Sequence, residues 1–351
     1  MHKRYSMVFW LMILITFSLS VNSVVFAATG NKLDFYQLEN YIIPSSNKVV
    51  LSEKDLYELS AYSLDIARNE IFARHGYVFK NESYADYFST MPWYKKNSKF
   101  KESMLSSIEK KNTEFIRSYV NKLRSNFKEV KGKNITIDLN GDGIKENIAL
   151  TCTTGSDKYS LKVNKASISG TGDNLDGVMY IADIDTKDKY KEIAITESGP
   201  SADYNTYFYY YNGSRLIFMG KVQGSDFSIK ASGTGSFTTK TRGSILQTWF
   251  YTDEYKLNSD HTLSNLVKKY YKMNTIITVK KPLKLQKSPT DPAVATTLKA
   301  GEKVLLSDTD NKKWCAIETS GGIKGWFNVE PFDKIEGISA SEYFDGLSYA
   351  D

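Results

Sequence analysis

The sequence predicts a multidomain α+β protein: a small helical domain, a middle antiparallel β domain and a small C-terminal β-barrel. Three observations predict this order. Apolar residues recur at helical spacing over residues 44–125, strand-like runs follow over 134–272, and short strands separated by Gly and Pro fill 274–333. The 351 residues, 41% hydrophobic and 25% charged, suit a globular protein of several domains.

The N-terminal residues have the pattern of an export signal. Lys3 and Arg4 precede an apolar run over residues 7–17, and small residues stand at Val25 and Ala27. We therefore expect residues 1–27 to be a signal peptide that is removed on secretion. An uncleaved N-terminal anchor is the alternative. No later run is apolar and long enough to span a bilayer, so we expect no transmembrane anchor after cleavage.

Cysteine and histidine are scarce, and this scarcity excludes several classes of protein. Two cysteines and three histidines are too few for a disulfide scaffold or for a cysteine-rich structural zinc site. His2 lies in the predicted signal, which leaves His75 and His261. Cys152 and Cys315 are far apart in the sequence, and we interpret both as buried apolar residues rather than a disulfide.

The helical domain is predicted over residues 44–125. Leu51–Arg74 is expected to be helical, with a partial capping box at Ser52 and a second helical stretch from Ser60. A further helix is expected over Glu102–Asn126. The segment between them is rich in aromatic residues, which we expect to fill a compact core.

A nine-residue motif ends the first helical stretch. Its candidate functional residues are Arg68, Asn69, Glu70, Arg74, His75 and Gly76, with Trp93 and Tyr94 further along. The segment resembles the YARHG domain family of bacterial extracytoplasmic proteins, with Phe72 in place of the tyrosine that gives the family its name. The resemblance implies a fold unit rather than a reaction. We interpret the polar side chains as a network between helices rather than as an active site, and His75 as a structural residue at a helix C-terminus rather than a catalytic base.

The middle domain, residues 134–272, begins with an acidic loop. Its candidate ligands are Asp138, Asn140, Asp142, the backbone carbonyl of Ile144, and Glu146. Short oxygen-bearing side chains alternating with glycine can wrap around one calcium ion. Ala149 occupies the position where an EF-hand needs a glutamate, so this loop is not an EF-hand. The alternative is a turn held by Asp and Asn side chains without metal.

A second acidic loop repeats the pattern. Its candidate ligands are Asp183, Asp185, Asp188, Tyr190 and Glu192. The two loops resemble the calcium loops of FG-GAP/VCBS-type repeats in secreted proteins. Because only two copies are recognisable, we expect a partial propeller or a twisted antiparallel sheet instead of a closed ring. Calcium is expected at the first loop and is possible at the second.

The C-terminal segment, residues 274–333, contains six short strands separated by turn residues. The glycines and tryptophans of this segment resemble a bacterial SH3-type domain, a module that commonly attaches exported proteins to the cell wall. This resemblance implies Trp314 and Trp326 as candidates for binding a wall ligand, although either could belong to the core. An acidic tail, residues 334–351, follows.

Together these features predict a secreted, cell-wall-associated and non-catalytic bacterial protein that binds peptidoglycan or another anionic wall polymer. Residues 95–133 carry twelve basic side chains against four acidic ones, which would favour an anionic polymer. Nucleic acid is not an expected partner outside the cell. The alternatives are a carboxylate-based glycan hydrolase, and an extracellular sensor or adaptor that binds a protein partner.

Overall fold

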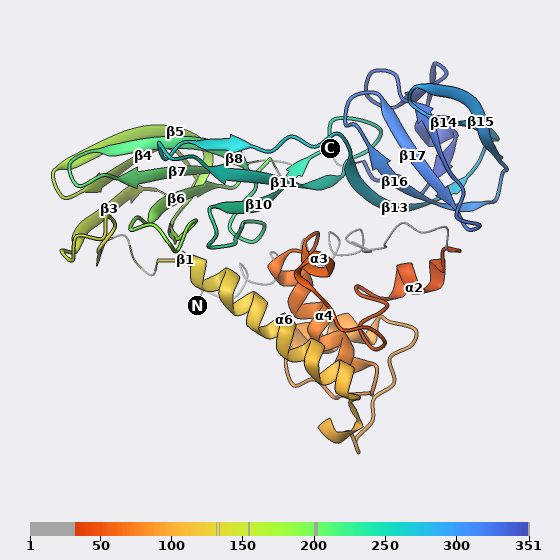
Figure 1. Ribbon diagram of the computed structural model, residues 1–351, viewed down its shortest axis with the longest axis horizontal. Helices are drawn as coiled ribbons and strands as arrows, with labels where there is room; N and C mark the ends of the chain where they lie inside the picture. The colour runs from red at the N-terminus through yellow and green to blue at the C-terminus, as the bar shows by residue number, and fades with distance from the viewer. Residues whose placement is uncertain (1–31, 131, 133, 154, 200–202, 350–351) are drawn as a thin grey trace, which may run out of the picture.

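A small helical region precedes a large antiparallel β region in the computed structural model (Figure 1). The structure describes residues 32–349, except 131, 133, 154 and 200–202. The predicted signal peptide, residues 1–27, lies outside these residues. Among the helices of the described residues, none combines the length and the apolar character that a membrane crossing requires.

Five α-helices and a short 3₁₀ turn make up the helical region. The helices are α2 (Phe35–Asn40), α3 (Glu53–Leu56), α4 (Ala61–Ala73), α5 (Glu82–Ser89) and α6 (Ser107–Asn126), with the 3₁₀ turn at Glu102–Met104 before α6. Their shared core includes Leu56, Leu64, Ile71, Phe88 and Ile116, all nearly inaccessible to solvent. The aromatic residues between α4 and α6 surround this core, as the sequence predicts.

One helix boundary agrees with the prediction and one differs. The second helical stretch expected from Ser60 is α4, because Ser60 has an extended backbone and its side chain accepts a hydrogen bond from Ser63 N. The helix expected from Glu102 begins at Ser107. There Ser106 and Glu109 form a reciprocal capping box, which fixes the start of α6.

The first β layer is an eight-stranded sheet that forms a continuous meander. Its strands are β1 (Phe127–Glu129), β2 (Asn134–Ile137), β3 (Glu146–Cys152), β4 (Ser156–Val163), β5 (Ala166–Ala182), β6 (Glu192–Glu197), β7 (Asn205–Tyr211) and β8 (Leu216–Gln223). The order is β2-β3-β4-β5-β6-β7-β8, with β1 paired to β5. This is the twisted-sheet option of the prediction, because sequential pairing across one sheet does not divide it into propeller blades. The sheet curls as a half-barrel around a core that includes Leu150, Leu161, Ile193 and Tyr209.

A four-stranded sheet packs against the other face of the meander. Its strands are β9 (Lys230–Ala231), β10 (Ser236–Arg242), β11 (Phe250–Leu257) and β12 (Leu263–Asn265), in the order β12-β11-β10-β9. Phe208 of the first sheet and Phe237 of the second meet in a separate core, with ring centroids 5.1 Å apart. All six residues of β6 are buried, because cores lie on both of its faces.

The C-terminal sheet contains the six predicted strands at the predicted places. They are β13 (Tyr271–Val279), β14 (Leu283–Ser288), β15 (Asp291–Leu298), β16 (Lys303–Thr309), β17 (Trp314–Thr319) and β18 (Lys324–Asn328), and β21 (Phe344–Asp345) joins them. In the order β15-β14-β18-β17-β16-β13-β21, the two end strands, β15 and β21, are not paired with each other. The closed-barrel assignment therefore stays a prediction.

The acidic tail belongs to this C-terminal unit. After the short hairpin β19 (Lys334–Ile335) and β20 (Ile338–Ser339), β21 pairs with β13, and Phe344 lies in the same core as Phe327. The same core also contains Ile245 and Trp249. Both residues belong to the segment predicted to be part of the middle domain, residues 134–272. An open sheet leaves apolar surface on one side, and these flanking segments cover it.

The two cysteines are free and buried, as predicted. Cys152 lies in the half-barrel core and Cys315 in the C-terminal core. Burial raises the pKa of the Cys315 thiol to about 12, so this thiol is held in its unreactive form.

Candidate functional site

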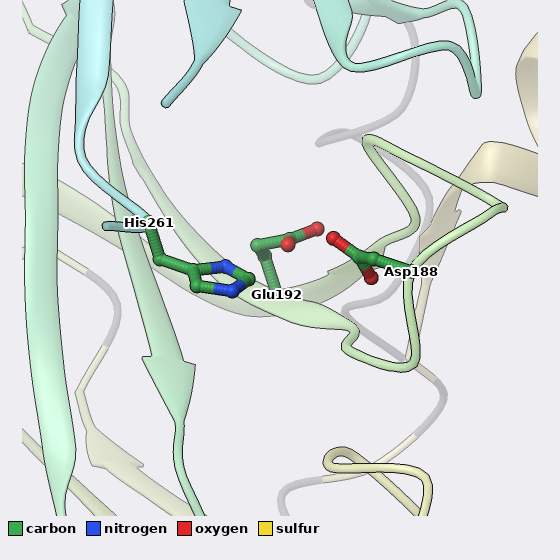
Figure 2. A group of neighbouring side chains, drawn as sticks. All are labelled: Asp188, Glu192 and His261. Carbon is green, nitrogen blue, oxygen red and sulfur yellow. The ribbon is translucent and has the colours of Figure 1, made fainter. Parts of the chain in front are cut away.

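The second acidic loop brings two carboxylates to a histidine. Asp188 and Glu192 come from the loop that enters β6, and His261 comes from the turn between β11 and β12. One ligand atom from each of the three residues lies within 4.8 Å of the others. Figure 2 shows the edge of the imidazole ring and the two carboxylates converging from these separate segments.

Glu192 is the buried member of this cluster. Its side chain is inaccessible to solvent, and Oε2 accepts a hydrogen bond from Ile184 N at 3.1 Å. The other oxygen, Oε1, is buried without a hydrogen-bond partner. Burial raises the pKa of this carboxyl to about 8, and the nearby charges of Asp188 and Asp183 act in the same direction.

His261 is held by its turn and by two aromatic rings. Its backbone has a φ of 59°, and its N–H donates to Asn258 O at 3.0 Å. The imidazole stacks on Tyr210 at 4.5 Å between centroids and meets Tyr190 edge to face at 4.6 Å. Nδ1 is buried without a hydrogen-bond partner. Sequence analysis missed this residue, because no spacing pattern connects it to the acidic loop.

The other predicted ligands of the second loop are engaged locally. Asp183 forms an ion pair with Lys191 at 2.9 Å, and Asp185 Oδ1 accepts from Lys187 N at 3.1 Å. Tyr190 N donates to Asp188 Oδ1 at 2.7 Å. Of the five predicted residues, Asp188 and Glu192 therefore belong to the cluster with His261.

The first acidic loop is held by hydrogen bonds to its own backbone. Asp138 accepts from Gly141 N and Gly143 N, Asn140 from Asp142 N, Asp142 from Ile144 N, and Glu146 from Leu139 N. These five bonds are 2.7–2.9 Å long. Such bonds are those of a turn held by Asp and Asn side chains without metal, which is the predicted alternative to a calcium loop. Calcium at this loop stays a prediction.

Trp314 and Trp326 lie on the same face of the C-terminal sheet. Cys315 and Phe327 point into the core, so their neighbours along β17 and β18 point to the opposite face. Trp326 pairs with Ala316, two residues from Trp314, which places the two indoles at diagonal positions. We call this side of the sheet, away from the core, the outer face.

Cationic side chains and a tyrosine surround Trp326 on the outer face. Trp326 is 7% exposed, because Tyr270 packs on it with ring centroids 4.7 Å apart. Lys324 lies 5.6 Å from the Trp326 ring, and Lys269 lies 5.1 Å from the Tyr270 ring. Tyr270 and Trp314 themselves are partly exposed, so they are the aromatic rings that solvent reaches.

The helical motif forms a structural network. Glu70 is 2% exposed, accepts from Ile42 N at 2.7 Å and pairs with Arg74 at 2.6 Å. Arg74 also donates to Ile43 O and lies over the Tyr41 ring. These bonds connect α4 to the segment that precedes it.

Further motif residues connect other segments of the helical region. His75 Nε2 lies 2.9 Å from Glu109 Oε1 on α6, and Trp93 Nε1 donates to Asn40 O. Tyr94 donates to Tyr77 O. Gly76 has a φ of 80°, and a Cβ there would meet Lys95 O at 2.4 Å, so glycine is required at this position.

The remaining two motif residues act within α4. Asn69 donates to Asp65 O one turn earlier, and Arg68 lies over the Phe72 ring at 5.3 Å. Residues 39–121 match the YARHG domain. The match includes α3, α4, α5 and most of α6, and it supports the resemblance of this part of the chain to the YARHG family; we call residues 39–121 the YARHG domain. No curated protein is similar to the chain.

In the YARHG domain the motif side chains are used for packing. Each pairs with backbone or side chains of the domain, and the His75–Glu109 pair joins two of its helices. This arrangement agrees with the interpretation of the motif as a polar network between helices.

Proposed function

We propose that the protein is exported and acts as a non-catalytic binding protein of the bacterial cell envelope. Its ligand is peptidoglycan or another anionic wall polymer, held on the outer face of an SH3-like C-terminal sheet. The observation that carries this proposal is the gathering of Trp314, Trp326 and Tyr270 on one face, with lysines beside the rings.

The chemistry of this face suits an anionic glycan. Aromatic rings offer apolar surface to sugar rings, and lysine ammonium groups attract carboxylate or phosphate groups. Asp308 is buried between β13 and β17 and pairs with Lys272 and Lys324. It therefore fixes the ammonium group of Lys324 near the Trp326 ring, and that of Lys272 on the neighbouring strand β13. The exposed face of α6, with Lys110, Arg117 and other basic residues, adds positive charge elsewhere on the surface.

The alternative function, a glycan hydrolase, has less support than binding of a wall polymer. A glycan hydrolase needs two carboxyl groups that flank the scissile bond, one of them ready to give a proton. In the first acidic loop, the desolvation of Asp138 is outweighed by hydrogen bonds from Gly143 N and Gly141 N, which hold the pKa of this carboxyl below its usual value. In the second loop the pKa of Glu192 is raised, but this side chain is inaccessible to solvent and therefore to a sugar ring. Calcium at the first acidic loop remains part of the proposal, as a stiffener of the middle sheets.

The experiment is co-sedimentation of the full chain with purified wall sacculi, in buffers of low and high salt. We expect Trp314→Ala and Tyr270→Ala to reduce the bound fraction at least about fivefold, because each removes an aromatic surface that solvent reaches. Tyr62→Ala is the matched control, since Tyr62 is 47% exposed on α4 in the YARHG domain.

Three results would contradict the proposal. The chain would fail to sediment with sacculi, the outer-face variants would bind as well as Tyr62→Ala, or soluble sugar fragments would appear during incubation. The last result would favour the hydrolase alternative. Recovery of a polypeptide from whole envelope, with no retention on protein-free wall, would favour the adaptor alternative.

A further inference from the structure

We propose that Asp188, Glu192 and His261 form a site for a divalent transition-metal ion of the zinc type, and that this ion joins the two stacked sheets of the β region. The three residues come from two segments that are far apart in the sequence. The proposal is independent of wall binding by the C-terminal sheet.

Two buried polar atoms of this cluster, one on Glu192 and one on His261, have no hydrogen-bond partner within the described residues. Glu192 is fully buried, and its Oε1 has no hydrogen-bond partner. His261 Nδ1 is also buried without a partner, within the same small cluster. Buried polar atoms nearly always have a hydrogen-bond partner, because a buried atom without one has lost its bonds to water and gained none in return. One cation between them would satisfy both atoms.

The chemical types of the three ligands indicate which metal ion would bind. Calcium and magnesium take oxygen ligands, whereas imidazole nitrogen suits zinc and its neighbours in the first transition row. Zinc accepts imidazole nitrogen and carboxylate oxygen in the same site, and three protein ligands leave a fourth position for a water. The His261 donor therefore favours zinc over the calcium predicted from the loop sequence.

The surroundings hold the ligands in position. The imidazole is fixed between Tyr190 and Tyr210, and Glu192 is fixed through its other oxygen by Ile184 N. Side chains that are already ordered lose little entropy on binding metal. The turn of His261 also has a left-handed backbone, which fits a residue whose orientation is constrained by its role.

The location gives the ion a structural role. Glu192 begins β6 in the eight-stranded sheet, and His261 lies between β11 and β12 of the four-stranded sheet. A metal bound to both residues would cross-link the sheets at one edge of the core that contains Phe208 and Phe237. The predicted consequence is that zinc raises the melting temperature of the β region.

The test is isothermal titration of the full chain with zinc chloride and, separately, with calcium chloride, after metal has been removed with a chelator. We expect one high-affinity zinc ion per chain. Any calcium bound by the first loop should bind equally well to the variants of the zinc site. Glu192→Gln and His261→Asn should each weaken zinc binding about 100-fold or more, because each removes a ligand. Asparagine tolerates the left-handed backbone of residue 261.

Two matched variants and one folding control complete the design. His75→Gln removes the described histidine outside the site, and Asp142→Asn removes a carboxylate from the first loop; both should bind zinc as the wild type does. Circular dichroism and melting in chelator establish that each variant is folded. Absent zinc binding, unchanged zinc affinity in either site variant, or calcium binding that is lost in these variants together with zinc binding would overturn the proposal.

Discussion

Lys230 Nζ donates a hydrogen bond of 2.8 Å to the carbonyl oxygen of Leu59, and so joins a β-strand to the YARHG domain. The same ammonium group contacts the carbonyl oxygens of Leu56 and Tyr57 at the end of α3. Lys230 is 5% exposed, and burial lowers its pKa to about 7. A lysine buried this deeply needs such acceptors, and here it donates to carbonyl oxygens at and just after the end of a short helix.

Lys230→Met is therefore expected to weaken the connection between the helices and the sheets. Methionine fills a similar volume but leaves the three carbonyl oxygens without this donor. We expect a loss of about 2 kcal/mol in the free energy of unfolding, measured by urea denaturation. Lys256→Met is the control, because Lys256 is exposed on β11. Equal denaturation midpoints for the two variants would show that the contact contributes nothing.

The ion pairs in the YARHG domain should differ in importance. Glu70 pairs with Arg74 while buried, whereas Glu114 pairs with Arg117 at the surface, where both side chains are more than half exposed. Glu70→Gln is expected to cost about 3 kcal/mol, because it leaves the arginine partly buried without its counter-ion. Glu114→Gln should cost less than about 0.5 kcal/mol. Thermal melting of both variants measures the difference, and a Glu70→Gln variant as stable as Glu114→Gln would refute it.

Asp308 should make the C-terminal sheet sensitive to acid. Burial alone would raise its pKa, but the hydrogen bond from Lys324 and the charge of Lys272 outweigh burial and hold the pKa below the usual 3.8. The folded chain therefore binds fewer protons than the unfolded chain in acid, and the stabilisation is complete above pH 3.8 and is lost as the pH falls through the folded pKa.

The measurement for Asp308 compares the wild type with Asp308→Asn by denaturation at several pH values. We expect the wild type to be more stable by about 2 kcal/mol at neutral pH, and the difference to shrink below about pH 4. Glu318→Gln serves as the control, because Glu318 is a partly exposed partner of Lys324 at 3.6 Å. A difference that stays constant down to about pH 2 would exclude the ionised carboxylate as the cause.

Two glycines of the first acidic loop should respond differently to alanine. Gly141 and Gly143 both have positive φ, at 68° and 86°. A Cβ on Gly141 would meet the backbone oxygen of Lys189 in the second loop at 2.7 Å, whereas a Cβ on Gly143 would have no neighbour within 4 Å. Both substitutions should cost about 1 kcal/mol for the left-handed backbone, and Gly141→Ala about 1–3 kcal/mol more. Equal melting temperatures would mean that the two acidic loops are not in close contact.

The sequence by itself determined the local features of this protein. Helical spacing, the capping box at Ser52 and the second helical start at Ser60 predicted where helices form, because these signals act within a few residues. Turn residues between short apolar runs predicted the strands of the C-terminal sheet for the same reason. The free, buried state of both cysteines followed from their number and spacing.

Only the tertiary structure decided which distant residues meet. It brought His261 to Glu192, covered Trp326 with Tyr270, and directed Lys230 to the end of α3. These contacts depend on strand register, on the curl of each sheet and on how one layer packs on the next. A local sequence pattern predicts neither the register nor the packing of the layers, because a strand has the same alternation of side chains whichever strand it pairs with.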